Sequence, residues 1–224
     1  VTVIESNSFF GCSSLKKAVI PNSVTSIGNG SFCQCSSLEQ VNIPDSITII
    51  GNNTFCDCHL LEDIEMPSSL KTIGNCAFKN CRTFKQIQIP DSVTSIGNSC
   101  FIGCSSIKQI NLSNSVLIIE DYLFSGCKSL NNVNYSNSLT SIGYCSFSDC
   151  TSIKQFTIPS TTKIIKDFAF NNCKSLEQII IPPSIKSIPQ NAFNNCTNLK
   201  TITINPYQTN FDSKTFSTLK CLNI

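Results

Sequence analysis

The chain has 224 residues, of which 13% are charged, about half of the usual share of roughly 25%. Its 16 basic and 14 acidic residues nearly cancel, which argues against a nucleic-acid binder that relies on a basic face. No apolar run approaches the ~20 residues that a membrane-spanning helix needs, so we expect no membrane span in this chain.

One pattern of residues recurs every 23 positions along the chain. A cysteine lies at this interval without an insertion, at Cys12, Cys35, Cys58, Cys81, Cys104, Cys127, Cys150, Cys173 and Cys196. A phenylalanine lies three residues before each of them, at Phe9, Phe32, Phe55, Phe78, Phe101, Phe124, Phe147, Phe170 and Phe193. A fixed period of this length is typical of repeat proteins whose equivalent units stack on one another.

Each repeat begins with a segment that we interpret as a short helix or helical turn. Phe32, Cys35 and Leu38 follow Ser31 at the spacing of residues on one helical face. Asn29 precedes this segment and is expected to cap it through its side-chain oxygen.

The next part of the repeat predicts a strand and an extended return. Val41 and Ile43 alternate with polar residues, the period of a strand, and Pro44 ends the capacity of that strand to donate hydrogen bonds. The segment 45–50 turns and brings apolar residues back to the core. Gly51 then provides a corner at which we expect a positive φ.

A unit of 23 residues buries too little apolar surface to fold alone, so neighbouring units must share one core. The sequence therefore predicts an α/β repeat solenoid, an array with a parallel β-ladder and short helical turns. We expect a single domain over residues 1–224 with nine 23-residue units. Residues 205–224 predict a degenerate C-terminal unit or cap. Val1 falls in the middle of a repeat, so we expect residue 1 to be a domain boundary.

The repeat resembles the BspA-like leucine-rich repeat family. The resemblance rests on the segments 24–28 (VTSIG), 32–35 (FCQC) and 38–44 (LEQVNIP), which recur along almost the whole chain. It implies a right-handed leucine-rich-repeat solenoid, with no catalytic residues and no cofactor to carry over. It also implies a protein at the cell surface or outside the cell that adheres to, or recognises, a host or matrix macromolecule.

The cysteines bear on both compartment and cross-linking. Those in the repeating position are expected to be buried, where a thiol packs as a small apolar group. A column of reduced thiols favours a reducing compartment, so a cytoplasmic location is the alternative to the cell surface. Cys33 and Cys56 share a position in adjacent units and could form a disulfide. His59 is the single histidine, and we predict no metal site.

The strand residues that point away from the core form the candidate binding surface. We expect this surface to be concave and to bind a protein or glycan partner. Its candidate residues are Gln40, Asn42, Asp63, Glu65, Gln86, Gln88, Gln109, Asn111, Asn132, Asn134, Gln155 and Gln178. The alternative is that these amides bond to one another along the sheet and only solvate it.

Charged residues gather at one half of this surface. The acidic group comprises Glu39, Glu62, Asp63 and Glu65, and the neighbouring basic group comprises Arg82, Lys85 and Lys108. We interpret this half as the part that selects a partner electrostatically. The same acidic residues would be the only candidates for a carbohydrate-active solenoid enzyme, which we do not expect, since no partner histidine accompanies them. A structural spacer and an intracellular scaffold remain as alternative functions.

Overall fold

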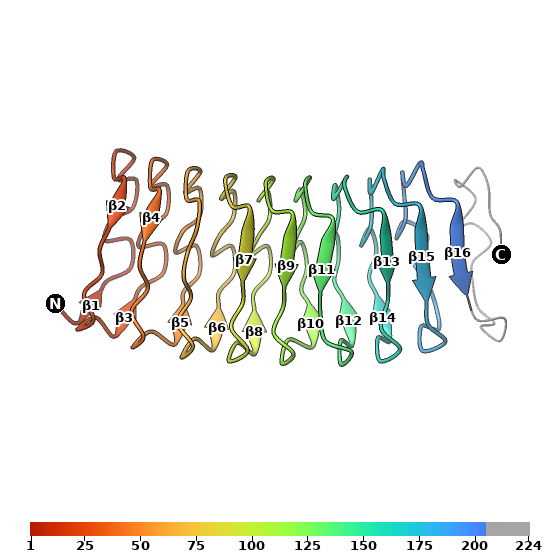
Figure 1. Ribbon diagram of the computed structural model, residues 1–224, viewed down its shortest axis with the longest axis horizontal. Coiled ribbons are helices and arrows are strands. Elements are labelled where there is room, and N and C mark those ends of the chain that lie inside the picture. Colours follow the sequence, from red (N-terminus) through yellow and green to blue (C-terminus); the bar gives the residue numbers. More distant parts are fainter. Residues whose placement is uncertain (205–224) are drawn as a thin grey trace.

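The computed structural model describes residues 1–204 as a rod of stacked coils whose strands lie in two columns of parallel pairs (Figure 1). We call these columns the first and second ladder; each is divided into three shorter sheets. The first ladder contains β2 (Lys17–Ala18), β4 (Gln40–Val41), β7 (Gln86–Gln88), β9 (Gln109–Asn111), β11 (Asn132–Asn134), β13 (Gln155–Thr157), β15 (Gln178–Ile181) and β16 (Thr201–Ile204). The second ladder contains β1 (Val3–Ile4), β3 (Ser26–Ile27), β5 (Ile49–Ile50), β6 (Thr72–Ile73), β8 (Ser95–Ile96), β10 (Ile118–Ile119), β12 (Ser141–Ile142) and β14 (Ile164–Ile165). The degenerate unit that we expect at residues 205–224 lies outside the described residues.

The register of both ladders follows the repeat of the sequence. In the first ladder Gln86 pairs with Gln109, and in the second Ile118 pairs with Ser141, in each case one repeat further along the chain. The parallel solenoid is therefore confirmed. The extended return that follows each proline is itself a short strand, so each coil has two strands where the sequence indicated one.

The predicted helical turn is wrong, because no helix occurs in residues 1–204. The amide of Phe32 donates to Thr54 O of the next coil at 3.0 Å, whereas the amide of Cys33 donates backward to Gly30 O at 3.0 Å. Every second amide of the segment thus donates to the next coil. In an α-helix these amides would donate to carbonyl groups four residues earlier in the same segment. Gly30 and Gln34 also adopt positive φ, 63° and 62°, which an α-helix does not accommodate.

The expected roles of Asn29 and Gly51 also differ from the structure. Asn29 Oδ1 accepts a hydrogen bond from Asn52 N of the next coil at 2.8 Å. Asn52 Oδ1 likewise accepts a hydrogen bond from Asn75 N at 2.8 Å. Gly51 has no positive φ; a Cβ there would lie 2.4 Å from Asn29 Oδ1. The glycine is thus required because it leaves room for the asparagine that bonds the coils together.

The repeating phenylalanines form one continuous stack through the core. Consecutive rings from Phe9 to Phe193 lie 5.1–5.9 Å apart between centroids, with nearly parallel planes. From Phe32 onward these rings are fully buried. Each coil therefore completes the apolar packing of the coil before it.

The repeating cysteines form a second column beside the rings. The thiol of Cys104 donates to Phe78 O of the preceding coil at 3.0 Å, and each repeating thiol from Cys35 to Cys196 makes the equivalent bond at 3.0–3.2 Å. Burial raises the pKa of the Cys35 thiol to about 11 and that of Cys104 well above the ordinary value of 9.0. These thiols are therefore neutral at physiological pH.

The first member of the cysteine column departs from the expected burial. Cys12 is exposed, and Phe9 is 39% exposed, whereas Cys35 and Phe32 are buried. The first described coil has a neighbour on one side only, and this accounts for the difference. Burial of a residue in the repeating positions thus depends on a coil lying against both of its sides.

The stack makes Phe101 a test of how far each coil depends on its neighbours. We expect Phe101→Ala to lower the free energy of unfolding by about 3–5 kcal/mol, because it leaves a cavity between the buried rings of Phe78 and Phe124. Urea unfolding followed by circular dichroism measures the change. Phe9→Ala is the matched control and should cost much less, since Phe9 is partly exposed. Equal losses for the two variants would contradict a stack that shares its burial between coils.

The thiol column predicts that the fold loses stability in alkaline solution. Above pH 9.0 the thiols of the unfolded chain lose their protons, whereas the buried thiols keep theirs because burial raises their pKa. The unfolded state then binds fewer protons, so each buried thiol should lower stability by about 1.4 kcal/mol per pH unit. Urea unfolding at pH 8 to 10.5 measures this slope. The variant Cys104→Ala/Cys127→Ala should show a shallower slope, and an unchanged slope would contradict the assignment.

Candidate functional site

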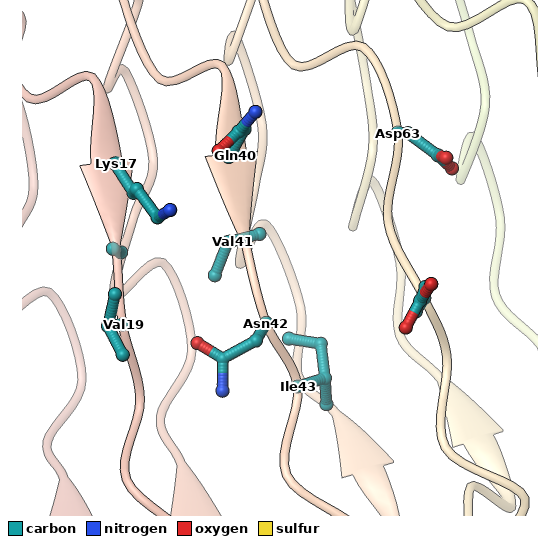
Figure 2. A pocket seen from close by; sticks show the side chains of 9 residues that line it. Lys17, Val19, Gln40, Val41, Asn42, Ile43 and Asp63 are labelled. Carbon is teal, nitrogen blue, oxygen red and sulfur yellow. The ribbon is translucent and has the colours of Figure 1, made fainter.

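The outward side chains of the first ladder form the surface that the sequence singles out. They lie in two rows, because alternate strand residues point to the same side. We call the row through Lys17, Gln40, Asp63, Gln86, Gln109, Asn132, Gln155 and Gln178 the first row. We call the row through Val19, Asn42, Glu65, Gln88, Asn111 and Asn134 the second row. Figure 2 shows Lys17, Gln40 and Asp63 on one level and Val19 and Asn42 on the next.

The candidate residues are accessible on this surface. All of them are exposed except Asn111, which is half-buried. The sequence pattern thus identifies correctly which strand residues face away from the core. Whether they bind a partner stays a prediction.

The ladder is interrupted at Asp63. Between β4 and β7 it is reduced to one bridge, from Gln40 to Asp63. Asp63 Oδ1 accepts a hydrogen bond from Ile64 N at 2.8 Å, so this amide is bonded locally and not to the neighbouring coil. A hollow of about 510 Å³ lies on the β4 side of Asp63 (Figure 2), and one of about 670 Å³ lies on its β7 side. Asp63 and Glu65 line both hollows.

Two more hollows lie towards the other end of the same surface. One of about 270 Å³ lies beside Tyr135 and Phe156. The other, of about 740 Å³, is lined by Asn131, Ser152, Lys154, Gln155, Ser175, Glu177 and Gln178. Sequence reasoning missed Asn131, Ser152 and Ser175, which flank the strands; their only signal is a polar residue at the same position in several repeats. Among the candidate residues, Asn134 alone lines none of these four hollows.

The second row bonds largely to itself. Asn111 Nδ2 donates to Gln88 Oε1 at 3.2 Å, and Asn134 Nδ2 donates to Asn111 Oδ1 at 2.6 Å. Asn42 accepts from Ile20 N at 2.8 Å and donates to Ile20 O at 2.7 Å. For this row the alternative interpretation holds, since these amides satisfy one another or the backbone.

The first row differs, because most of its amides have no partner among residues 1–204. Among residues 1–204 no hydrogen bond joins another residue to the side chains of Gln40, Gln86, Asn132, Gln155 or Gln178. Each exposed amide offers two N–H donors and one carbonyl acceptor to the solvent. The first row therefore presents unoccupied donors and acceptors at regular intervals along the rod.

The charges at the β4–β7 end of this surface are also unpaired. Asp63 and Glu65 are exposed, as are Lys85 and Lys108, which lie two and three coils further on from β4. The ion pairs of the described residues lie elsewhere: Lys166 with Asp121 at 2.9 Å and Lys200 with Glu177 at 3.1 Å. An arriving partner would thus meet these carboxylates and ammonium groups without displacing an existing ion pair.

Other kinds of site find little support in the described part of the chain. No three or more histidine, cysteine or acidic side chains of residues 1–204 converge in a way that could hold a metal ion. His59 Nδ1 lies 3.1 Å from Asn80 O, so the histidine contacts the backbone of a neighbouring coil. Residues 1–204 contain no helix with the length and apolar character that a membrane span requires.

The two cysteines for which the sequence allows a disulfide lie on successive coils. Cys33 and Cys56 are both buried and carry free thiols in this structure. The Cys56 thiol donates to Asp57 Oδ2 at 3.4 Å, and burial raises the pKa of both thiols. A disulfide between them stays a prediction.

This prediction can be tested by mild oxidation of the folded chain. With oxidised glutathione as electron acceptor, the two thiols would lose two protons and two electrons and form one S–S bond. Because their pKa is raised, thiolate is scarce, and the reaction should be slow near pH 7 and faster near pH 9. Peptide mapping after alkylation should find Cys33 linked to Cys56. Cys33→Ser is the control; alkylation of both cysteines in oxidised wild-type protein would contradict the pairing.

Comparison with known proteins places the fold. A family model described as the BspA type leucine-rich repeat region matches residues 2–131 and 117–224, in 6 copies. No curated protein matches the chain.

Solved structures show the same architecture. The leucine-rich repeat protein of T. pallidum, TpLRR, is 29% identical, with a TM-score of 0.64 over 68% of this chain and 72% of that one. The pneumococcal vaccine antigen PcpA is 19% identical, with a TM-score of 0.63 over 99% of this chain and 65% of that one. A leucine-rich repeat protein from Eubacterium ventriosum is 20% identical, with a TM-score of 0.61 over 96% of this chain and 79% of that one. The last two likenesses concern the fold alone.

Proposed function

Since the chain belongs to the BspA type leucine-rich repeat family, we propose that it binds an extended segment of a protein partner along the first row. Leucine-rich repeat proteins generally act as protein-interaction or surface modules and are typically not enzymes. The observation that carries the proposal is the series of exposed first-row amides that have no partner within the described chain.

The spacing of the first row suits an extended polypeptide. Successive first-row residues lie on hydrogen-bonded neighbouring strands, such as Gln86 on β7 and Gln109 on β9, so they are about 4.8 Å apart. A peptide laid across the strands would meet a new donor and acceptor pair at each coil. Solenoid proteins use extended surfaces of this kind for binding. The hollows beside Asp63, and those beside Gln155, leave room for side chains of such a partner.

Charge provides the selectivity in this proposal. Asp63 and Glu65 line two adjacent hollows and have no ion-pair partner among the described residues. A basic side chain seated in either hollow would gain an ion pair, whereas an acidic one would be repelled. Complementary charges of this kind affect the association rate and the choice of partner more than the final affinity.

We place this interaction at the cell surface and propose that its partner is a host or matrix protein. The support is the family, which is typically surface-associated. The buried thiols are compatible with that location: from Cys35 to Cys196 each repeating thiol is covered by neighbouring coils, and so is protected from external oxidants.

The proposal is tested by binding to a panel of purified extracellular-matrix proteins, measured by biolayer interferometry at several salt concentrations. For a matrix protein that binds, we expect Asp63→Lys/Glu65→Lys to weaken the affinity at least tenfold, about 1.4 kcal/mol, and to alter its salt dependence. The reason is that the reversal removes both carboxylates that line the two hollows.

The matched control is Asp45→Lys/Asp91→Lys, which makes the same change of charge at exposed turn residues away from the first row. It should leave the affinity within a factor of two of wild type. If the Asp63/Glu65 variant keeps both the affinity and the salt dependence of wild type, this surface is not where the partner binds.

A further inference from the structure

Three aromatic side chains gather away from the first ladder, where the second ladder passes into the tight turns of the coils. Tyr122 follows β10, Tyr144 follows β12 and Phe168 follows β14. The ring centroids of Tyr122 and Tyr144 lie 5.3 Å apart and those of Tyr144 and Phe168 lie 5.9 Å apart. Tyr122 is 38% exposed, and the other two rings are partly exposed. We call these three residues the aromatic patch.

The other coils do not need aromatic residues at these positions. The position of Tyr122 and Phe168 is occupied elsewhere by Asn7, Gly30, Asn53, Cys76, Ser99 and Cys145. The position of Tyr144 is occupied elsewhere by Asn29, Asn52, Asn75, Asn98, Asp121 and Asp167. Because the same turn forms with small or polar residues in those coils, folding alone does not account for the rings.

The backbone at two of these rings is also strained. Tyr122 has φ 58° and Phe168 has φ 55°, in the left-handed region that bulky side chains rarely occupy. The equivalent Asn53, with φ 55°, is of a residue type that adopts this conformation more readily. The positive φ belongs to the turn itself, since Cys76, Ser99 and Cys145 share it, but a bulky ring accommodates it less readily than a small side chain does. The strain and the exposure together indicate a binding role.

Negative charge surrounds the patch. Asp121 Oδ1 accepts a hydrogen bond from Tyr144 N at 2.7 Å, and Asp167 directly precedes Phe168. Burial raises the pKa of the neighbouring Cys145 thiol, and the charges of Asp167, Asp149 and Asp121 raise it further. Lys166 is paired with Asp121 at 2.9 Å, and this is the cation that contacts the group. Asp167 is held in place by Phe168 N at 3.2 Å and Asn191 Nδ2 at 3.3 Å. Three carboxylates thus face one paired cation, Lys166, which leaves this part of the surface with an excess of negative charge.

We propose that the aromatic patch binds a lysine or arginine side chain of a basic peptide segment. A cation is attracted to the face of an aromatic ring, and the surrounding carboxylates strengthen that attraction. Adjacent rings are inclined to each other by 67° and 73°, so they form no flat platform for a sugar ring. The site does not involve the first row, so it stands independently of the function proposed above.

The test uses the full chain and a variant that restores the residues of other coils, Tyr122→Ser/Tyr144→Asn/Phe168→Asn. Ser99, Asn98 and Asn53 show that these residues are compatible with the turn. The probe is a fluorescein-labelled nona-arginine peptide, followed by fluorescence anisotropy. Both the triple variant and its parent carry Asp63→Lys/Glu65→Lys, so that the first-row hollows attract no basic side chain. In this background we expect the triple substitution to weaken peptide binding at least tenfold. The melting temperature of the triple variant should be maintained or should rise by about 2–4 °C, because strain is relieved.

Two further variants separate the explanations. Asp45→Lys/Asp91→Lys, which reverses charge at exposed turn residues outside the first row and the aromatic patch, should retain the peptide affinity of its parent. Tyr122→Phe keeps the ring without its hydroxyl and should also retain it. Peptide binding that survives in the triple variant would overturn the proposal, as would its loss in Tyr122→Phe. Tighter binding of neutral cellohexaose than of the peptide, abolished in the triple variant, would overturn it in favour of a glycan site.

Discussion

The constraint on which this structure depends is a single register of 23 residues, shared by backbone and side chains. Gln86 bonds to Gln109 in one ladder, the ring of Phe78 stacks on Phe101, and the equivalent thiols and asparagines follow the same interval. An inserted residue would shift the strands, the rings and the thiol bonds together. This explains why the repeating cysteine recurs without an insertion.

The sequence predicted those parts of the fold that the period alone determines. It identified the stack, the buried positions and the outward rows correctly, since each follows from which residues recur at one position. It failed at the segment around Phe32, because the spacing of Ser31, Phe32 and Leu38 suits a helix and a series of tight turns equally well. The deciding signal was the recurrence of glycine, asparagine and aspartate at positions such as Gly30 and Asp57, which favour positive φ.

The candidate surface could be predicted in outline but not in detail. Alternation along the strands is enough to place Gln40 and Asn42 outside the core. It does not distinguish Asn42, whose amide bonds twice to Ile20, from Gln40, whose amide has no partner among residues 1–204. That difference depends on the preceding coil, which carries Ile20. For the same reason Tyr122 and Tyr144 are far apart in the sequence and meet only when the coils stack.

The arrangement of the coils also determines how the rod would respond to tension. Val1 and β16 lie at opposite ends of the described chain (Figure 1), and the hydrogen bonds between coils run along the axis that joins them. A pull on the two ends would therefore load the contacts between coils and could detach one coil at a time. Each released coil of 23 residues would lengthen the chain by about 75–80 Å. Such a rod would extend in steps under tension, and each step would dissipate part of the applied mechanical energy.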